Sequence, residues 1–251
     1  MRRICGVIPA AGKGSRLGLA GPKILTPVQA GSTIWSVLRD KLMPLVDHIQ
    51  IVLSPAGLES FRDVLSADPS RDRISVAVQD RPVGMGDAVF RGRDRWGKFD
   101  DVLIVWGDQV NLSARTLQAT LDEHRRSPSP GGTMPVTELP NPYVQYEFGP
   151  GERIIRLRQT REGDHTDLLG WSDLGVFCLS VQGLVEAWEH YLPTANLGTA
   201  TQEVNFLPFL LYLCSKRSWP IRPVPIEDSS EARGVNTLGD LEFARLRLAD
   251  R

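Results

Sequence analysis

The amino-acid sequence predicts an α/β fold, in which a doubly wound and mostly parallel Rossmann-like sheet is joined by a smaller second half. Two observations support this class. Over the first hundred residues, short apolar runs rich in Val and Ile alternate with stretches of helical spacing, and such runs are typical of buried parallel strands. A glycine-rich loop directly follows the first run, at the position where open α/β sheets place their ligands.

The first half contains four predicted strands with helices between them. The strands are expected at residues 4–8, 48–53, 74–78 and 101–106. Helices are expected at residues 34–45, 58–65 and 86–96, where apolar side chains recur at helical spacing. This regular alternation of strand and helix favours a doubly wound sheet over an all-α or all-β fold.

The pattern changes after residue 110. A helix is predicted at 113–126, with Ser113 as its N-cap. Strands are predicted at 143–148, 153–158 and 173–179, and further helices at 181–191, 201–214 and 238–249. Because no repeat or long linker interrupts the sequence, we expect a single domain over 1–251, with a first half at 1–110 and a second half at 111–251 that ends in the C-terminal helix.

Composition excludes several classes of partner. Of 251 residues, 41% are hydrophobic and 24% are charged, and the net charge of -1 provides no overall basic field for nucleic acid. No apolar run approaches the ~18 residues of a membrane span. The three cysteines lie far apart in apolar segments, which indicates reduced thiols in a cytoplasmic protein. The oligomeric state is not indicated by any pattern.

The loop "PAAGKGSRLGLAGPK" combines glycines with three cations, Lys13, Arg16 and Lys23. Glycines allow peptide N–H groups to face phosphate oxygens, and the cations add positive charge. Two familiar phosphate-binding patterns do not fit, because neither the Walker A spacing nor G-x-G-x-x-G is present. The loop therefore indicates an anion site of another kind, with a purely structural turn as the alternative.

The motifs resemble those of the sugar-1-phosphate nucleotidyltransferases, and most closely the uridyltransferase half of the bacterial N-acetylglucosamine-1-phosphate uridyltransferases. "AAGKGSRLG" followed by "PKIL" is similar to the family signature. Four further stretches are similar to family motifs and follow in the same order along the chain: "QDRPVGMGDAV", "WGDQV", "TQEVNFLPFL" and "RGVNTLGDLEFAR".

The resemblance implies attack of a phosphate oxygen on the α-phosphorus of a nucleoside triphosphate, with release of pyrophosphate. It assigns catalytic roles to Arg16, Lys23 and Asp108. Asp108 and Asn236 are expected to hold Mg²⁺, an ion that prefers oxygen ligands and keeps several waters. The alternative for Asp108 is a simple cap of the following helix.

The resemblance also implies a nucleotide site. Its phosphate contacts are expected from Ala10, Ala11, Gly12, Lys13 and Gly14. The base would be met by Gln79, whose amide offers both a donor and an acceptor, and by the backbone at Gly84. The expected nucleotide is UTP or dTTP, and the alternative for Gln79 is an ordinary solvated side chain.

The acceptor is expected to be a phosphorylated small molecule, with Asp173 and Glu203 as candidates for binding its hydroxyl groups. The match to the family is looser here, because "NPYVQYEF" lacks a glycine and no Thr-Asp follows Glu203. Two alternatives therefore stay open. One is a cytidylyltransferase acting on a non-sugar phosphate or phosphonate, and the other is a non-catalytic nucleotide-binding regulator.

Overall fold

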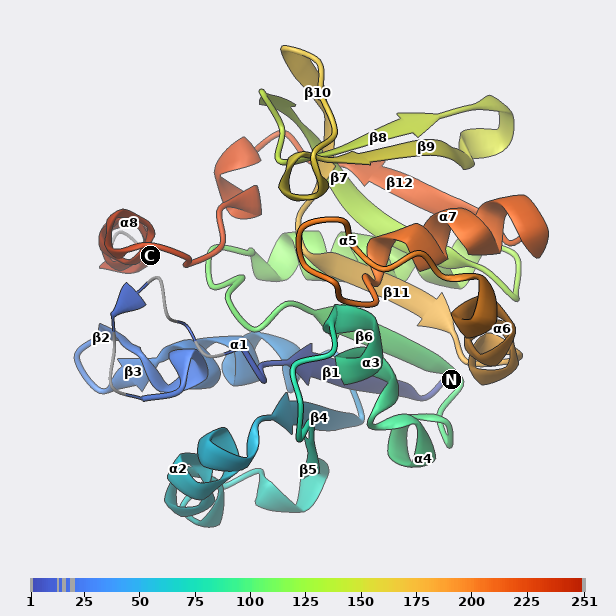
Figure 1. The fold of residues 1–251 in the computed structure, drawn as a ribbon. Helices are drawn as coiled ribbons and strands as arrows, with labels where there is room; N and C mark the ends of the chain where they lie inside the picture. Colours follow the sequence, from blue (N-terminus) through green and yellow to red (C-terminus); the bar gives the residue numbers. More distant parts are fainter. Residues whose placement is uncertain (1, 13, 15–16, 19–20, 250–251) are drawn as a thin grey trace.

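A ten-stranded sheet forms the centre of the computed structural model (Figure 1). The structure describes residues 2–12, 14, 17–18 and 21–249. From one edge to the other, nine of the strands follow the order β5 (Ile74–Val78), β4 (His48–Leu53), β1 (Ile4–Pro9), β6 (Asp101–Val105), β11 (Val176–Ser180), β7 (Gly132–Pro140), β10 (Leu169–Asp173), β8 (Val144–Phe148) and β9 (Ile154–Gln159). The tenth, β12 (Ile221–Pro225), pairs with β7.

The strand directions agree with the predicted class. β5, β4, β1 and β6 pair in parallel, and β7, β12 and β8 run in the same direction. Only β11, β10 and β9 run in the opposite direction within the described sheet. The mostly parallel, doubly wound α/β fold is therefore confirmed, and the same sheet continues through both halves of the chain.

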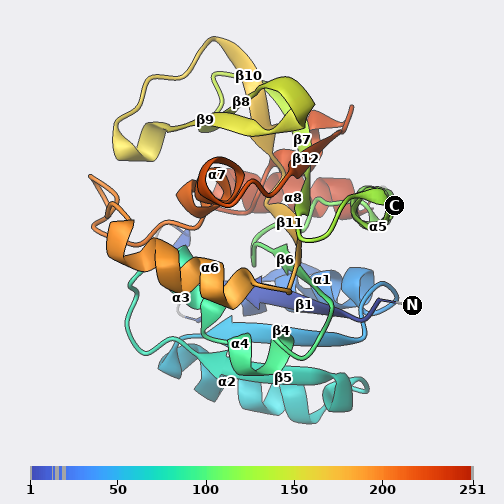
Figure 2. The ribbon, with the colours of Figure 1, turned by 90° about the vertical axis from the view of Figure 1, so that its right-hand side faces the viewer.

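Helices cover both faces of the sheet, and each face has its own apolar core. One core receives side chains from α1 (Ile34–Leu42), α2 (Pro55–Ser66), α5 (Ala114–Arg126) and α8 (Leu238–Ala249). The other receives side chains from α3 (Met85–Phe90), α4 (Arg93–Trp96), α6 (Leu184–Tyr191) and α7 (Leu207–Lys216). Figure 2 shows α6 and α7 on one side of the sheet and α1 and α5 on the other. With helices on both sides, every residue of β1, β4 and β6 is buried, including the polar His48, Gln50 and Asp101.

Most predicted elements are present with ends shifted by up to three residues, but three others are interrupted or begin later. The predicted helix at 86–96 is divided into α3 and α4. The predicted strand at 173–179 is interrupted, since β10 ends at Asp173 and β11 begins at Val176. The predicted helix at 201–214 begins only with α7, so the residues before it form an irregular segment. Ser113 caps α5 as expected, because its side chain accepts a hydrogen bond from the N–H of Thr116.

Three strands of the second half were not predicted: β7, β12 and β10, of which only Asp173 lies within a predicted strand. β7 lies in the interior of the sheet between β11, β10 and β12, and its sequence GTMPVTELP contains two prolines. β12 has the sequence IRPVP and pairs only with β7. Proline is tolerated on such an edge strand, but it weakens the strand signal in the sequence. Of the helices in the described part of the chain, none has the length and apolarity needed to cross a membrane.

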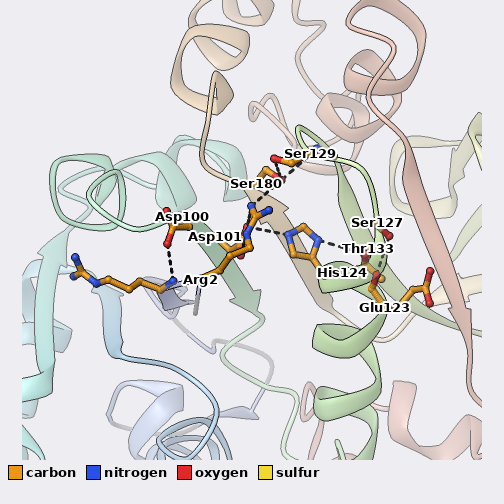
Figure 3. A network of polar contacts seen from close by, with 11 residues as sticks. Arg2, Asp100, Asp101, Glu123, His124, Ser127, Ser129, Thr133 and Ser180 are labelled. Atoms are coloured by element: carbon orange, nitrogen blue, oxygen red, sulfur yellow. Dashed lines mark hydrogen bonds and ion pairs between the residues drawn. The ribbon is translucent and has the colours of Figure 1, made fainter.

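A buried polar network joins the chain start to the amino end of β6 (Figure 3). Arg2 donates from Nε to Asp101 Oδ2 at 2.8 Å, and His124 Nε2 lies 3.0 Å from Asp101 Oδ1. Thr133 Oγ1 lies 3.4 Å from His124 Nδ1, and Arg2 also reaches Ser180 Oγ at 3.5 Å. The network thus connects β6, β11, β7 and α5 at the edge of the sheet where β1 and β6 begin.

Asp101 is ionised in this network. Burial disfavours its carboxylate, but hydrogen bonds from His124 and Arg2 favour it more, so the pKa of the carboxyl is held below its usual value. A carboxyl with a lowered pKa in the folded state stabilises the fold above its unfolded pKa of about 4. That contribution is lost as the pH falls through the lower folded pKa.

We predict that Asp101→Asn lowers the free energy of unfolding by about 3 kcal/mol at pH 7, because the buried His124 and the partly exposed Arg2 lose their anionic acceptor. Asp100→Asn is the matched control, since Asp100 is exposed and accepts only from the N–H of Arg3 among the hydrogen bonds described for its side chain. Urea unfolding would measure both, and the difference between Asp101→Asn and wild type should shrink below about pH 4. Equal losses in the two variants would contradict this assignment.

Candidate active site

Three side chains from distant parts of the sequence meet at the carboxyl ends of β1 and β6. The ammonium of Lys23 donates to Asp108 Oδ2 at 2.8 Å and to Asn236 Oδ1 at 3.1 Å. The side chains of Lys23 and Asp108 are only 18% and 20% exposed. Lys23 opens a short 3₁₀ turn after the glycine-rich loop, Asp108 follows β6, and Asn236 precedes α8.

The backbone around Asp108 explains how these segments come together. β1 and β6 are neighbouring parallel strands, so both end at the same edge of the sheet. The N–H of Val235 donates to the carbonyl of Asp108 at 3.0 Å, which ties the segment of Asn236 to the end of β6. A Cβ at Gly234 would lie 3.1 Å from Asp108 Cγ, so glycine permits this close approach.

The glycine-rich loop lies against Lys23. The N–H of Ala10 donates to the carbonyl of Val52 at 2.8 Å, which holds the start of the loop beside β4. A Cβ at Gly14 would lie 3.1 Å from Cβ of Lys23. Ala11 and Gly12 lie between these two points. Two of the residues predicted to bind phosphate, Lys13 and Arg16, lie outside the described residues.

Gln79 is buried just after β5, and its amide has a fixed orientation. Nε2 donates to the carbonyl of Gly84 at 3.0 Å and to Asp87 Oδ2 at 2.9 Å. Asp87 also accepts from Arg91 Nε at 3.0 Å. Since both amide hydrogens have acceptors within the protein, the group that Gln79 retains for a ligand is the acceptor Oε1.

Gly84 contacts the second half of the chain. Its φ of 125° favours glycine, and a Cβ there would lie 2.5 Å from the carbonyl oxygen of Val204. The N–H of Val204 donates to the carbonyl of Val83 at 3.0 Å, and the N–H of Gly86 donates to the carbonyl of Val204 at 3.1 Å. The side of Gly84 that a Cβ would occupy is therefore filled by Val204, and a role of its backbone in base binding stays a prediction.

The two residues predicted to bind the acceptor have different surroundings. Asp173 Oδ2 accepts from the hydroxyl of Tyr146 at 3.0 Å, and its Oδ1 accepts from the N–H of Gly175 at 2.7 Å. Burial raises the pKa of the Asp173 carboxyl, and these two hydrogen bonds only partly oppose the rise. Glu203 lies in the irregular segment before α7 and is half-buried. Their roles as ligands of an acceptor stay predictions.

Sequence reasoning missed two residues that shape this region. Gln109 follows Asp108 directly and is 7% exposed, and its Oε1 has no hydrogen-bond partner among the described residues. Gln109 belongs to the stretch "WGDQV", directly after Asp108, and this position was the signal in the sequence. Glu162 accepts from the N–H of Ala200, Thr201 Oγ1 and Asn205 Nδ2, and thereby holds the segment that carries Glu203. No motif in the sequence marks Glu162.

The oxygens of Asp108 and Asn236 fit a magnesium site. Both lie within hydrogen-bond distance of one ammonium nitrogen, so they converge on a single centre of positive charge. Mg²⁺ is commonly held by one or two protein oxygens together with waters and substrate phosphates. In the described part of the chain, no group of three or more His, Cys, Asp or Glu residues could hold a metal, so a richer ligand set is not found there.

A glycine-rich loop and a paired cation and carboxylate at the carboxyl edge of a doubly wound sheet are features of a nucleotide-binding α/β protein. Comparison with known families identifies the particular class of nucleotide-binding protein. Residues 6–165 match the model of the MobA-like NTP transferase domain, and the chain therefore belongs to this family of nucleotidyltransferases.

Individual relatives agree with this family. The chain is 26% identical over 238 residues to the bifunctional protein GlmU of Pediococcus pentosaceus, covering 92% of this chain and 48% of the relative. It is 26% identical over 240 residues to GlmU of Coxiella burnetii (strain CbuG_Q212), covering 94% of this chain and 50% of the relative. The chain thus spans about half the length of these curated relatives.

Solved structures support the fold. A putative glucose-1-phosphate thymidylyltransferase from Bacillus anthracis, in complex with a sucrose, is similar with a TM-score of 0.75 at 17% identity, covering 99% of this chain and 96% of that one. The 4-diphosphocytidyl-2C-methyl-D-erythritol synthase of Anaerococcus prevotii has a TM-score of 0.66 at 15% identity and covers 99% of both chains. At these identities the likeness concerns the fold.

The packing of Gly84 can be tested separately from its backbone angle. We predict that Gly84→Ala lowers the free energy of unfolding by at least about 2 kcal/mol, because the new Cβ meets Val204 and the φ is unfavourable. Gly31→Ala is the control, since Gly31 has a φ of 75° with nothing within 4 Å of the added Cβ. It should lose only about 1 kcal/mol. Urea unfolding of both variants measures the difference, and equal losses would refute the contact.

Proposed function

We propose that the protein joins a nucleoside triphosphate, UTP or dTTP, to a sugar 1-phosphate with release of pyrophosphate. The observation that carries this proposal is the convergence of Lys23, Asp108 and Asn236 beside the glycine-rich loop. The name of one matched protein is compatible with it, since that protein is a putative glucose-1-phosphate thymidylyltransferase.

The proposed phosphoryl transfer requires positive charge around the phosphates more than it requires a general base. Both reactants are anions, so the protein must neutralise their repulsion and align the attacking oxygen with the leaving pyrophosphate. A phosphate monoester has a second pKa near ~6 and is largely dianionic at pH 7, so its oxygen needs no general base. In keeping with this, His48 lies at the amino end of β4 and His124 in the Asp101 network, both at the end of the sheet opposite to Asp108.

Each cationic and oxygen group then has a distinct task. In this proposal, Lys23 contacts the α-phosphate or the acceptor phosphate, Arg16 stabilises the charge on the transferring phosphoryl group, and Lys13 contacts the β- and γ-phosphates. Asp108 and Asn236 hold Mg²⁺, which when bound supplies charge neutralisation at the phosphate oxygens. A cationic contact made mainly in the transition state contributes on the order of 3 kcal/mol.

The nucleotide base is assigned to the segment that contains Gln79. With both amide hydrogens engaged, Oε1 would accept from the N3–H of uracil or thymine, or from the exocyclic amine of cytosine. Because Oε1 also fits cytosine, a cytidylyltransferase that acts on a non-sugar phosphate or phosphonate is the second candidate. The structural neighbour from Anaerococcus prevotii, named as a 4-diphosphocytidyl compound synthase, is compatible with that candidate.

One experiment tests both candidates. Pyrophosphate release would be measured with UTP, dTTP, CTP, ATP and GTP against sugar 1-phosphates, polyol phosphates and phosphonates in the presence of Mg²⁺. Turnover with a sugar 1-phosphate and UTP or dTTP is the expected result. Turnover confined to CTP and a non-sugar acceptor would favour the second candidate, and nucleotide binding without any turnover would favour a regulator.

Asp108→Asn should lower kcat at least about 100-fold while leaving the fold intact, because the neutral amide loses the charge that would hold the cation. Asp100→Asn serves as the matched control, since Asp100 is an exposed carboxylate at the start of β6. Turnover by pyrophosphate release and unfolding by circular dichroism would be measured on both variants. Near-normal turnover of Asp108→Asn with Mg²⁺ would contradict the assignment.

Pyrimidine nucleotides should stabilise the protein more than purine nucleotides. A ligand at about 100 times its Kd raises the free energy of unfolding by roughly 2.7 kcal/mol, which a thermal shift detects. We expect the largest shift with UTP or dTTP plus Mg²⁺, and a smaller pyrimidine shift in Gln79→Met because its acceptor is removed. Stabilisation by ATP or GTP alone would overturn the role of Gln79.

A further inference from the structure

The ammonium of Lys23 lies where the cation of the proposed reaction is expected. It donates to Asp108 Oδ2 at 2.8 Å and to Asn236 Oδ1 at 3.1 Å, the two oxygens assigned to Mg²⁺. We infer that Lys23 occupies the magnesium site of the nucleotide-free protein, and that a divalent cation binds there only when Lys23 moves away. This inference rests on the proposed function and concerns the regulation of the same site.

Charge and burial make the two cations mutually exclusive. The carboxylate of Asp108 is one negative charge, and in the described contacts it is already paired with one positive charge. With exposed fractions of 18% and 20%, the side chains of Lys23 and Asp108 lie in a region where like charges repel more strongly than in bulk water. A divalent ion on the same oxygens would lie within a few ångströms of the ammonium, so one of the two must leave.

The nucleotide supplies the alternative partner for Lys23. Triphosphate oxygens are strong acceptors for an ammonium, and the loop that would bind them lies against Lys23 at Gly14. When Lys23 turns to a phosphate, Asp108 Oδ2 and Asn236 Oδ1 lose this ammonium and can accept a cation in its place. Nucleotide and cation should therefore increase each other's affinity, and by linkage the effect is equal in both directions.

The test measures cation binding without nucleotide and without turnover. Mn²⁺, used as the probe, would be titrated into wild type and Lys23→Met, and free Mn²⁺ followed by electron paramagnetic resonance. We expect Lys23→Met to bind Mn²⁺ at least about tenfold more tightly, equivalent to ~1.4 kcal/mol. Lys23→Arg retains a cation on a side chain of similar reach and should stay close to wild type.

Lys41→Met controls for the loss of a nearby positive charge. The ammonium of Lys41 donates to the carbonyl of Val110, two residues beyond Asp108. Its Mn²⁺ affinity should remain within about threefold of wild type, a difference of ~0.7 kcal/mol. Equal affinities of wild type and Lys23→Met, or equal tightening in Lys41→Met and Lys23→Met, would overturn the inference.

Two further measurements separate this inference from the proposed function. If Asp108→Asn abolishes Mn²⁺ binding in the presence of UTP while Lys23→Met binds like wild type without UTP, the magnesium site stands and the occupation by Lys23 is refuted. If Asp108→Asn binds Mn²⁺ like wild type under both conditions, the proposed site itself fails, and the inference with it.

Wild-type protein provides a measurement that does not depend on a variant. Without nucleotide, saturating Mg²⁺ should make the amine of Lys23 more reactive toward an acylating reagent, as measured by mass spectrometry, because the ammonium has left its two acceptors. An unchanged reactivity of Lys23 at saturating Mg²⁺ would refute the displacement.

Discussion

The parallel pairing of β1 with β6 is the constraint on which the rest of the candidate site depends. Neighbouring parallel strands end at the same edge of the sheet, so the loop after β1 and the carboxylate after β6 lie close together. The hydrogen bond from Val235 to Asp108 then adds a third segment from near the end of the chain. The site is thus assembled from local strand geometry and one backbone contact between distant segments.

The fold could largely be predicted because buried parallel strands have a simple signature, and the four strands predicted in the first half lie where their apolar runs indicated. The interior strand β7 was missed since its prolines resemble loop residues. The contacts of Lys23 lie beyond such reasoning, because its partners are 85 and 213 residues away. Motif order indicated which residues matter, but only the folded chain places an ammonium on both oxygens.

Backbone hydrogen bonds join residues 83–86 to the irregular segment before α7. Val204 exchanges backbone hydrogen bonds with Val83 and Gly86 and occupies the space beside Gly84. Glu162 holds the rest of the same segment through three donors. A change in the segment before α7 can therefore shift residues 83–86, and a change near Gln79 can shift that segment.

The Arg2–Asp101–His124 network lies at the amino ends of the strands, whereas Lys23, Asp108 and Asn236 lie at the carboxyl ends. This separation has an evolutionary consequence. In related proteins, residues around the candidate site can be exchanged, and a different acceptor can thereby be accommodated. Such exchanges do not weaken the Arg2–Asp101–His124 network, because it lies at the other end of the strands. A fold arranged in this way can change its acceptor without losing stability, because the two properties depend on residues that are not in contact.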